Sequence, residues 1–116
     1  MATKIAHSDQ LSALERPGRT VKEFVGPDDA NHLAMGLVEF PPGSDAPAHT
    51  HDAQEEIVFV LSGVGSVLLD GQPFSLHPGT FVFIPPGVQH QVRNEGNTPV
   101  RLLYAFSPPV VVGTWE

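Results

Sequence analysis

Proline and glycine interrupt this chain so often that no stretch keeps a helical period. The 116 residues contain 12 prolines and 11 glycines. Turn groups such as Pro-Gly, Asp-Gly and Pro-Pro-Gly separate short apolar segments, among them EIVFVL at 56–61 and TFVFI at 80–84. Proline lacks a backbone donor and glycine tolerates positive φ, so both residues favour turns. Short β-branched and aromatic runs between closely spaced turns indicate an all-β fold.

The segments between the turns predict about nine or ten β-strands. They are expected at 21–25, 33–40, 48–51, 56–61, 64–69, 74–76, 80–84, 90–93 and 100–106. A single helical turn is expected at 11–14, stopped by Pro17-Gly18. Asp70-Gly71 favours a two-residue type I′ hairpin. Strands in this number form a sandwich, a jelly roll or a small barrel.

Two of the predicted strands are apolar at consecutive positions, at 56–61 and at 80–84. Alternate side chains of a strand point to opposite faces, so we expect both faces of these strands to be covered. One face would point into a barrel and the other would meet a second layer or a partner subunit. The apolar tail at 110–116 also requires cover. These features predict a homodimer.

Composition limits the classes of partner. Hydrophobic residues make up 41% of the chain, enough for one packed domain over residues 1–116. Lys and Arg count 6 against 13 Asp and Glu, for a net charge of −7, which argues against binding nucleic acid or an anionic membrane. No apolar run approaches the ~20 residues of a membrane span. The N-terminal residues MATKIAHSDQ lack the apolar core of a signal peptide, which predicts a cytoplasmic location.

Histidines and carboxylates are the available ligands for a transition metal, because the chain has no cysteine. His49 and His51 are two residues apart, so in a strand they point to the same face. Glu55 and Glu56 open the most apolar strand, and only one of them can face inward. His90 follows a Pro-Pro-Gly turn in a different strand. Three imidazoles and one carboxylate suit Fe, Mn, Ni, Zn or Cu.

At these residues the chain resembles the cupin family. The stretch 43–63 resembles the first cupin motif, G-x5-H-x-H-x4-E-x6-G, and 79–94 resembles the second, G-x5-P-x-G-x2-H-x3-N. Neither has a mismatch. The resemblance implies a double-stranded β-helix, or jelly-roll barrel, that binds one divalent metal per chain through His49, His51, Glu56 and His90. The motif spacing selects Glu56 as the ligand and leaves Glu55 facing outward.

The remaining motif positions are expected to serve the fold. Gly63, Gly79 and Gly87 are expected in turns with positive φ, and Asn94 as a turn cap. Three histidines without partner spacing are expected at the surface or an edge: His7, His32 and His77. Six aromatic residues are expected in the core or an interface, with one or two lining the site: Phe59, Phe81, Phe83, Tyr104, Phe106 and Trp115.

Three functional hypotheses follow from the resemblance and the site. The first is an Fe(II) dioxygenase acting on a small dicarbonyl or phenolic substrate, and the second is a non-redox isomerase, lyase or sugar-acid tautomerase. The third is a non-catalytic barrel that binds or senses a small molecule. Cations are scarce, so a neutral or monoanionic substrate fits best. In an enzyme, Glu56 would be catalytic by accepting a proton.

Overall fold

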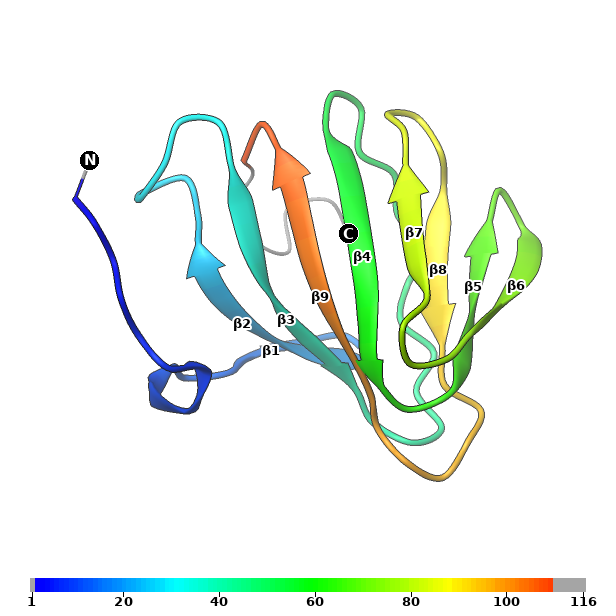
Figure 1. The fold of residues 1–116 in the computed structure, drawn as a ribbon. Helices are drawn as coiled ribbons and strands as arrows, with labels where there is room; N and C mark the ends of the chain where they lie inside the picture. Colours follow the sequence, from blue (N-terminus) through cyan, green and yellow to red (C-terminus); the bar gives the residue numbers. More distant parts are fainter. Residues whose placement is uncertain (1, 110–116) are drawn as a thin grey trace.

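The structure is a computed structural model that describes residues 2–109, and its elements are almost all strands (Figure 1). The described residues form one 3-10 turn, Ser8–Gln10, and nine β-strands. The strands are β1 (Leu14–Arg16), β2 (Arg19–Val25), β3 (Ala34–Phe40), β4 (Glu55–Ser62), β5 (Gly65–Leu69), β6 (Gln72–Leu76), β7 (Phe81–Ile84), β8 (His90–Arg93) and β9 (Val100–Ser107).

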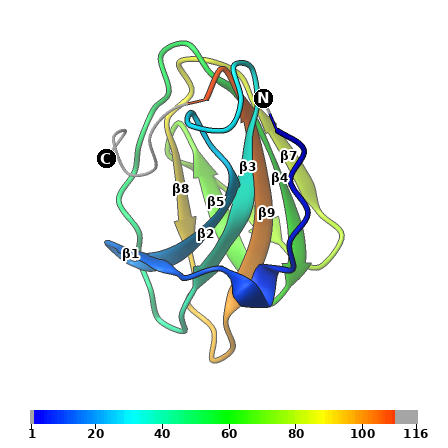
Figure 2. The same cartoon turned by 90° about the vertical axis from the view of Figure 1, so that its left-hand side faces the viewer.

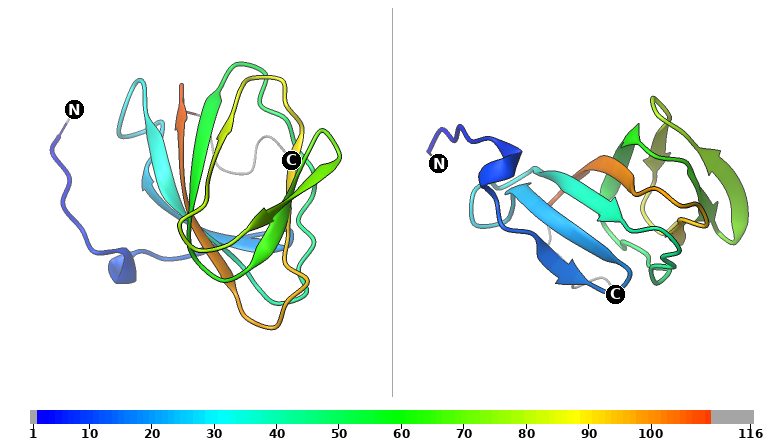
Figure 3. Two further views of the ribbon diagram at one scale, coloured as in Figure 1. Left: turned by 45° about the vertical axis from the view of Figure 1, so that its right-hand side comes forward. Right: turned by 90° about the horizontal axis from the view of Figure 1, so that it is seen from below.

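Two antiparallel sheets face each other and enclose the core (Figures 2 and 3). The larger has the order β1-β2-β3-β9-β4-β7, and the smaller has the order β6-β5-β8. Val60 of β4 packs with Val67 of β5 and Leu76 of β6, which joins the two sheets through one apolar cluster. The all-β jelly-roll barrel expected from the sequence is therefore confirmed.

The predicted hairpin turn at Asp70-Gly71 and the predicted turn cap at Asn94 are both present. Asp70 and Gly71 have φ values of 50° and 82° and join β5 to β6, the positive φ pair that a type I′ hairpin requires. The buried Asn94 side chain caps its turn, donating to the carbonyls of Phe40 and Thr98 at 3.0 and 2.8 Å. Its amide oxygen accepts from the Gly96 N–H at 3.1 Å.

The helical turn predicted at 11–14 is wrong. The turn lies at Ser8–Gln10, where the His7 side chain accepts a hydrogen bond from the Asp9 N–H and so caps it. Leu14 instead begins β1 and pairs with Val21 of β2. Pro17-Gly18 forms the turn between these two strands, so the tertiary pairing decides the conformation of Leu14.

The strand predicted at 48–51 is also wrong in part. Only His49 of this segment pairs, in an isolated antiparallel bridge with His90. Pro47 precedes it and has no N–H to donate, so a continuous ladder does not form there. The segment still runs beside β8, because Asp45 forms a second isolated bridge with Arg93.

β4 alternates between a buried and an exposed face. Glu56, Val58 and Val60 point into the barrel, whereas Ile57 and Phe59 remain 45% and 43% exposed. Within residues 2–109 no second layer covers the outer face of β4, so its cover by a partner subunit stays a prediction. The apolar tail expected to need cover, at 110–116, lies outside them.

Within residues 2–109, no helix has the length and apolar character needed to cross a bilayer.

Gly63 and Gly79 give a matched pair for testing the fold. Both have positive φ, 86° and 92°, but a Cβ at Gly63 would overlap the Pro99 carbonyl whereas one at Gly79 meets nothing within 4 Å. We expect Gly79→Ala to cost about 1–2 kcal/mol from backbone strain alone. Gly63→Ala adds a backbone clash and should cost at least about 1 kcal/mol more. Urea unfolding of the two variants measures the difference; equal losses would contradict the packing role of Gly63.

Candidate metal centre

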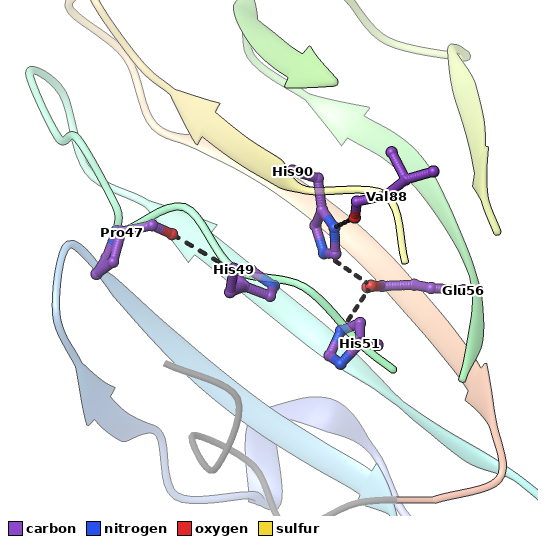
Figure 4. Close-up of polar contacts among 6 residues, drawn as sticks. All are labelled: Pro47, His49, His51, Glu56, Val88 and His90. Carbon is purple, nitrogen blue, oxygen red and sulfur yellow. Dashed lines mark hydrogen bonds and ion pairs between the residues drawn. The ribbon is translucent and has the colours of Figure 1, made fainter. Parts of the chain in front are cut away.

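One loop and two strands bring four potential metal ligands together (Figure 4). His49 and His51 lie in the loop before β4, Glu56 is near the start of β4, and His90 begins β8. One ligand atom from each of the four lies within 4.8 Å of the others. His51, Glu56 and His90 are buried, and His49 is half-buried. The group therefore has the size of a single-ion site.

Backbone hydrogen bonds hold the two loops against each other. His49 and His90 exchange N–H to carbonyl bonds in both directions, each 2.9 Å long. The Gly87 N–H donates to the His51 carbonyl, also at 2.9 Å. Gly87 has a φ of 86° and ends the Pro-Pro-Gly turn that precedes β8. The turn thus sets the position of His90 relative to the two loop histidines.

Further hydrogen bonds orient the rings (Figure 4). Nδ1 of His49 donates to the Pro47 carbonyl at 3.3 Å, and Nδ1 of His90 donates to the Val88 carbonyl at 3.1 Å. With Nδ1 as the donor, Nε2 of each ring is the nitrogen that can bind a metal. Oε1 of Glu56 lies 3.1 Å from Nε2 of His51 and 3.2 Å from Nε2 of His90.

The cluster combines an ionised carboxylate with a neutral imidazole. Burial by itself would raise the pKa of Glu56, but the neighbouring His51 and His90 side chains outweigh it and lower the pKa to about 2. Burial, followed by the charge of His90, lowers the pKa of His49 to about 3. At neutral pH both groups are therefore in the protonation state that binds a metal.

His90 provides the test of whether a metal fits. Its Nε2 is buried and has no hydrogen-bond partner of acceptable geometry, although it lies 3.2 Å from the Glu56 carboxylate. A buried polar atom without a partner is costly. A divalent cation at the centre of the cluster would satisfy this nitrogen and the carboxylate together. The donor set therefore fits a transition metal.

The cluster opens on a cavity of about 60 Å³ inside the barrel. Most of its wall is apolar, from residues of both sheets. The polar or charged side chains that line it are Arg19, His49, Glu56, His90 and Tyr104. A small organic molecule or a few waters would fill this volume.

Comparison with known proteins identifies the fold family. Residues 36–106, more than half of the chain, match the family model of the cupin domain. The chain belongs to the cupin family. This cupin is 32% identical to protein SchB of Streptomyces halstedii over 90% of its own length and 78% of SchB.

Two further similarities concern proteins whose names state an activity. The solved structure of the polyketide cyclase RemF from Streptomyces resistomycificus aligns with a TM-score of 0.80 and 25% identity, over 99% of this cupin and 88% of RemF. The dimethylsulfoniopropionate lyase DddQ of Ruegeria pomeroyi is 42% identical over 59% of this cupin and 34% of DddQ.

The structure of this cupin places the predicted ligands together. Glu56 points inward and Glu55 is exposed, as the motif spacing predicted. His7, His32 and His77 are exposed, in agreement with a surface or edge position.

The aromatic residues divide between two faces. Tyr104 and Phe106 line the cavity, whereas the outer-face residues Phe59, Phe81 and Phe83 do not. Trp115 lies outside the described residues. The sequence predicted that one or two of six aromatic residues line the site, Tyr104 and Phe106 among them, but it did not say which ones. The buried residues of β9 alternate from Val100 onward, and this period of two places Tyr104 and Phe106 on the same face of the strand. Deciding that this face is the inner one requires the pairing register with β4.

His51→Ala tests the ligand assignment. Loss of one buried imidazole should lower affinity for a divalent transition metal by more than about tenfold. The β-sheet circular dichroism spectrum should be retained, because His51 itself belongs to neither hydrophobic core cluster. The exposed residue His77 supplies the control, and His77→Ala should leave metal content unchanged. Metal analysis after equilibrium dialysis measures both. Full metal loading of His51→Ala would show that the assignment is wrong.

Proposed function

We propose that this cupin is a metal-dependent enzyme that acts on a small carbonyl or phenolic compound. The observation that carries the proposal is the buried His49, His51, Glu56 and His90 cluster opening on an apolar cavity of about 60 Å³. A divalent metal bound there would supply Lewis acidity toward a substrate oxygen. The three imidazoles hold the ion, and the apolar wall restricts water at the reacting atoms.

Glu56 is proposed as a ligand and as the catalytic proton acceptor. Its carboxylate lies between two imidazoles and faces the cavity. Its pKa of about 2 keeps it ionised but makes it a weak base. Glu56 would therefore accept a proton only from a strongly acidified substrate group, and a metal held by the cluster would supply that acidification. Carbonyl compounds with an adjacent C–H bond, and phenols, are acidified in this way.

Non-redox chemistry is the reaction class that we favour. Two of the similar proteins have names that state an activity, a polyketide cyclase and a lyase, and both names describe non-redox reactions. In an elimination or cyclisation at an acidified carbon, a metal held by the cluster would supply Lewis acidity and Glu56 would be the proton acceptor. The cytoplasmic location expected from the sequence stays a prediction.

An Fe(II) dioxygenase is the second candidate. Four protein ligands on an octahedral metal leave two positions, one for substrate and one for O2. This arrangement serves the small dicarbonyl or phenolic substrates that suit a cavity with few cations. Anaerobic loading with Zn(II), Mn(II) or Fe(II), followed by an oxygen-uptake and product screen over dicarbonyls and phenols, separates the two classes. Turnover without O2 supports the non-redox enzyme, whereas uptake with Fe(II) alone supports the dioxygenase.

Glu56→Gln tests the proton-transfer role. The amide oxygen of Gln can still bind the metal, although more weakly, but it cannot accept a proton. We therefore expect the metal to stay bound and turnover to fall by about 10²–10⁴-fold. Metal content and rate are measured on the same sample. Glu55→Gln, one residue away on the exposed face, should leave both unchanged. A near wild-type rate of metal-loaded Glu56→Gln would show that Glu56 acts only as a metal ligand and not as a proton acceptor.

We also propose that the cupin is a homodimer that pairs through the outer face of the larger sheet. On this face Phe83 is opposite Ile57, and Phe81 is opposite Phe59, in the pairing of β7 with β4. Phe81 and Phe83 are 66% and 52% exposed. The apolar face continues into β9 and β3 through Leu103, Ala105 and Met35. A contiguous exposed apolar patch of this kind marks an association surface.

Phe81→Glu tests the dimer. Two buried carboxylates at the interface would strongly oppose pairing, so light scattering should fall from about twice the chain mass of 12.4 kDa to the mass of one chain. Val64→Glu, at a residue that is 62% exposed away from this face, should remain dimeric. A monomeric wild-type protein at micromolar concentration would reject the homodimer.

A further inference from the structure

Tyr104 carries a buried hydroxyl that the fold does not use. The residue is only 4% exposed, and its hydroxyl oxygen has no hydrogen-bond partner among residues 2–109. Its ring stacks on Phe106 with centroids 5.3 Å apart, and the Phe106 ring lies 5.6 Å from that of His51. A buried polar group without a partner lowers stability. The cavity that Tyr104 shares with Glu56 and His90 suggests that the partner is a ligand.

The absence of a side chain at Gly36 makes room for this hydroxyl. Tyr104 in β9 pairs with Gly36 of β3 on one side and with Val58 of β4 on the other. A Cβ at Gly36 would overlap the Tyr104 hydroxyl. The ring therefore extends over β3, away from β4, on which Glu56 lies. A molecule bound at the metal cluster would reach the hydroxyl with its opposite end.

The surroundings of Tyr104 favour a neutral partner that accepts a hydrogen bond. Burial raises the pKa of the phenol, and the negative charges of Glu23 and Glu56 raise it further, so the hydroxyl keeps its proton and donates. The same charges repel a carboxylate or phosphate. Arg19 also lines the cavity, but its guanidinium donates to the Pro17 carbonyl. Arg19 is the first residue of β2, whereas Glu23 lies toward the other end of this strand.

We propose that Tyr104 determines specificity by donating a hydrogen bond to an uncharged carbonyl oxygen at the end of the substrate farthest from the metal cluster. The inference rests on the metal-dependent function proposed above and narrows its substrate class. The substrate has one oxygen function at the cluster and a ketone or aldehyde oxygen at Tyr104, with a short apolar connection between them. Dicarboxylates and sugar phosphates are disfavoured.

Three hydroxamates that differ at one position test this on the cobalt(II)-loaded protein. Pentanohydroxamate has only the metal-binding group, 4-oxopentanohydroxamate adds a ketone, and the monohydroxamate of succinate has a carboxylate at the same carbon. Titrations followed by the visible cobalt spectrum give the three affinities for wild type and for Tyr104→Phe, which removes only the hydroxyl. Cobalt content and thermal stability are measured on the same samples.

We expect wild type to bind the ketone probe about tenfold more tightly than pentanohydroxamate, the value of one hydrogen bond to a buried donor. The carboxylate probe should bind more weakly than the ketone probe. Tyr104→Phe should lose the ketone preference, keep its cobalt, and be equally or more stable, because no hydrogen bond of the fold is lost.

The outcomes separate this inference from the proposed function. If pentanohydroxamate does not perturb the cobalt spectrum of wild type, the open metal site is absent and both proposals fail. If it binds but the ketone preference is missing, or persists in Tyr104→Phe, the inference about Tyr104 alone is wrong. If Tyr104→Phe keeps the preference for the ketone probe but is markedly less stable, the hydroxyl serves the stability of the fold and not ligand binding.

Discussion

The antiparallel bridge between His49 and His90 is the contact on which the site depends. Strands β4 to β7 separate these residues in sequence, yet their backbones exchange two hydrogen bonds of 2.9 Å. The bridge holds the Cα atoms of these two histidines beside each other through the backbone alone. Carbonyls of Pro47 and Val88 then orient the rings. The cluster is thus held by backbone pairing, and a metal would bind to a largely formed site.

Burying Glu56 among imidazoles has an energetic cost that the local hydrogen bonds offset. A lone carboxylate in the barrel would be strongly destabilising, and burial alone would raise its pKa. Contacts of 3.1 and 3.2 Å with His51 and His90 reverse that shift. The carboxylate is consequently ionised and ready to balance the charge of a cation. The Tyr104 hydroxyl differs, because no group of the fold offsets its burial.

The alternation of side chains along β4 places two different functions on opposite sides of one sheet. Glu56 and Val58 face the cavity, while Ile57 and Phe59 form part of the exposed apolar face. β9 repeats this arrangement, with Tyr104 inside and Leu103 outside. A change in register by one residue would exchange the two sets. The site and the proposed dimer surface therefore depend on the same strand pairing.

From the sequence alone, turn residues and the short β-branched and aromatic runs between them determined the all-β class, and motif spacing distinguished Glu56 from Glu55. These properties are local, so they are readable without a structure. Only the tertiary structure decided that Leu14 belongs to a strand, that 48–51 pairs through His49 alone, and that Tyr104 extends over Gly36. Each of these depends on contacts between segments distant in the chain, and local propensity carries no information about which distant backbone will supply the partner.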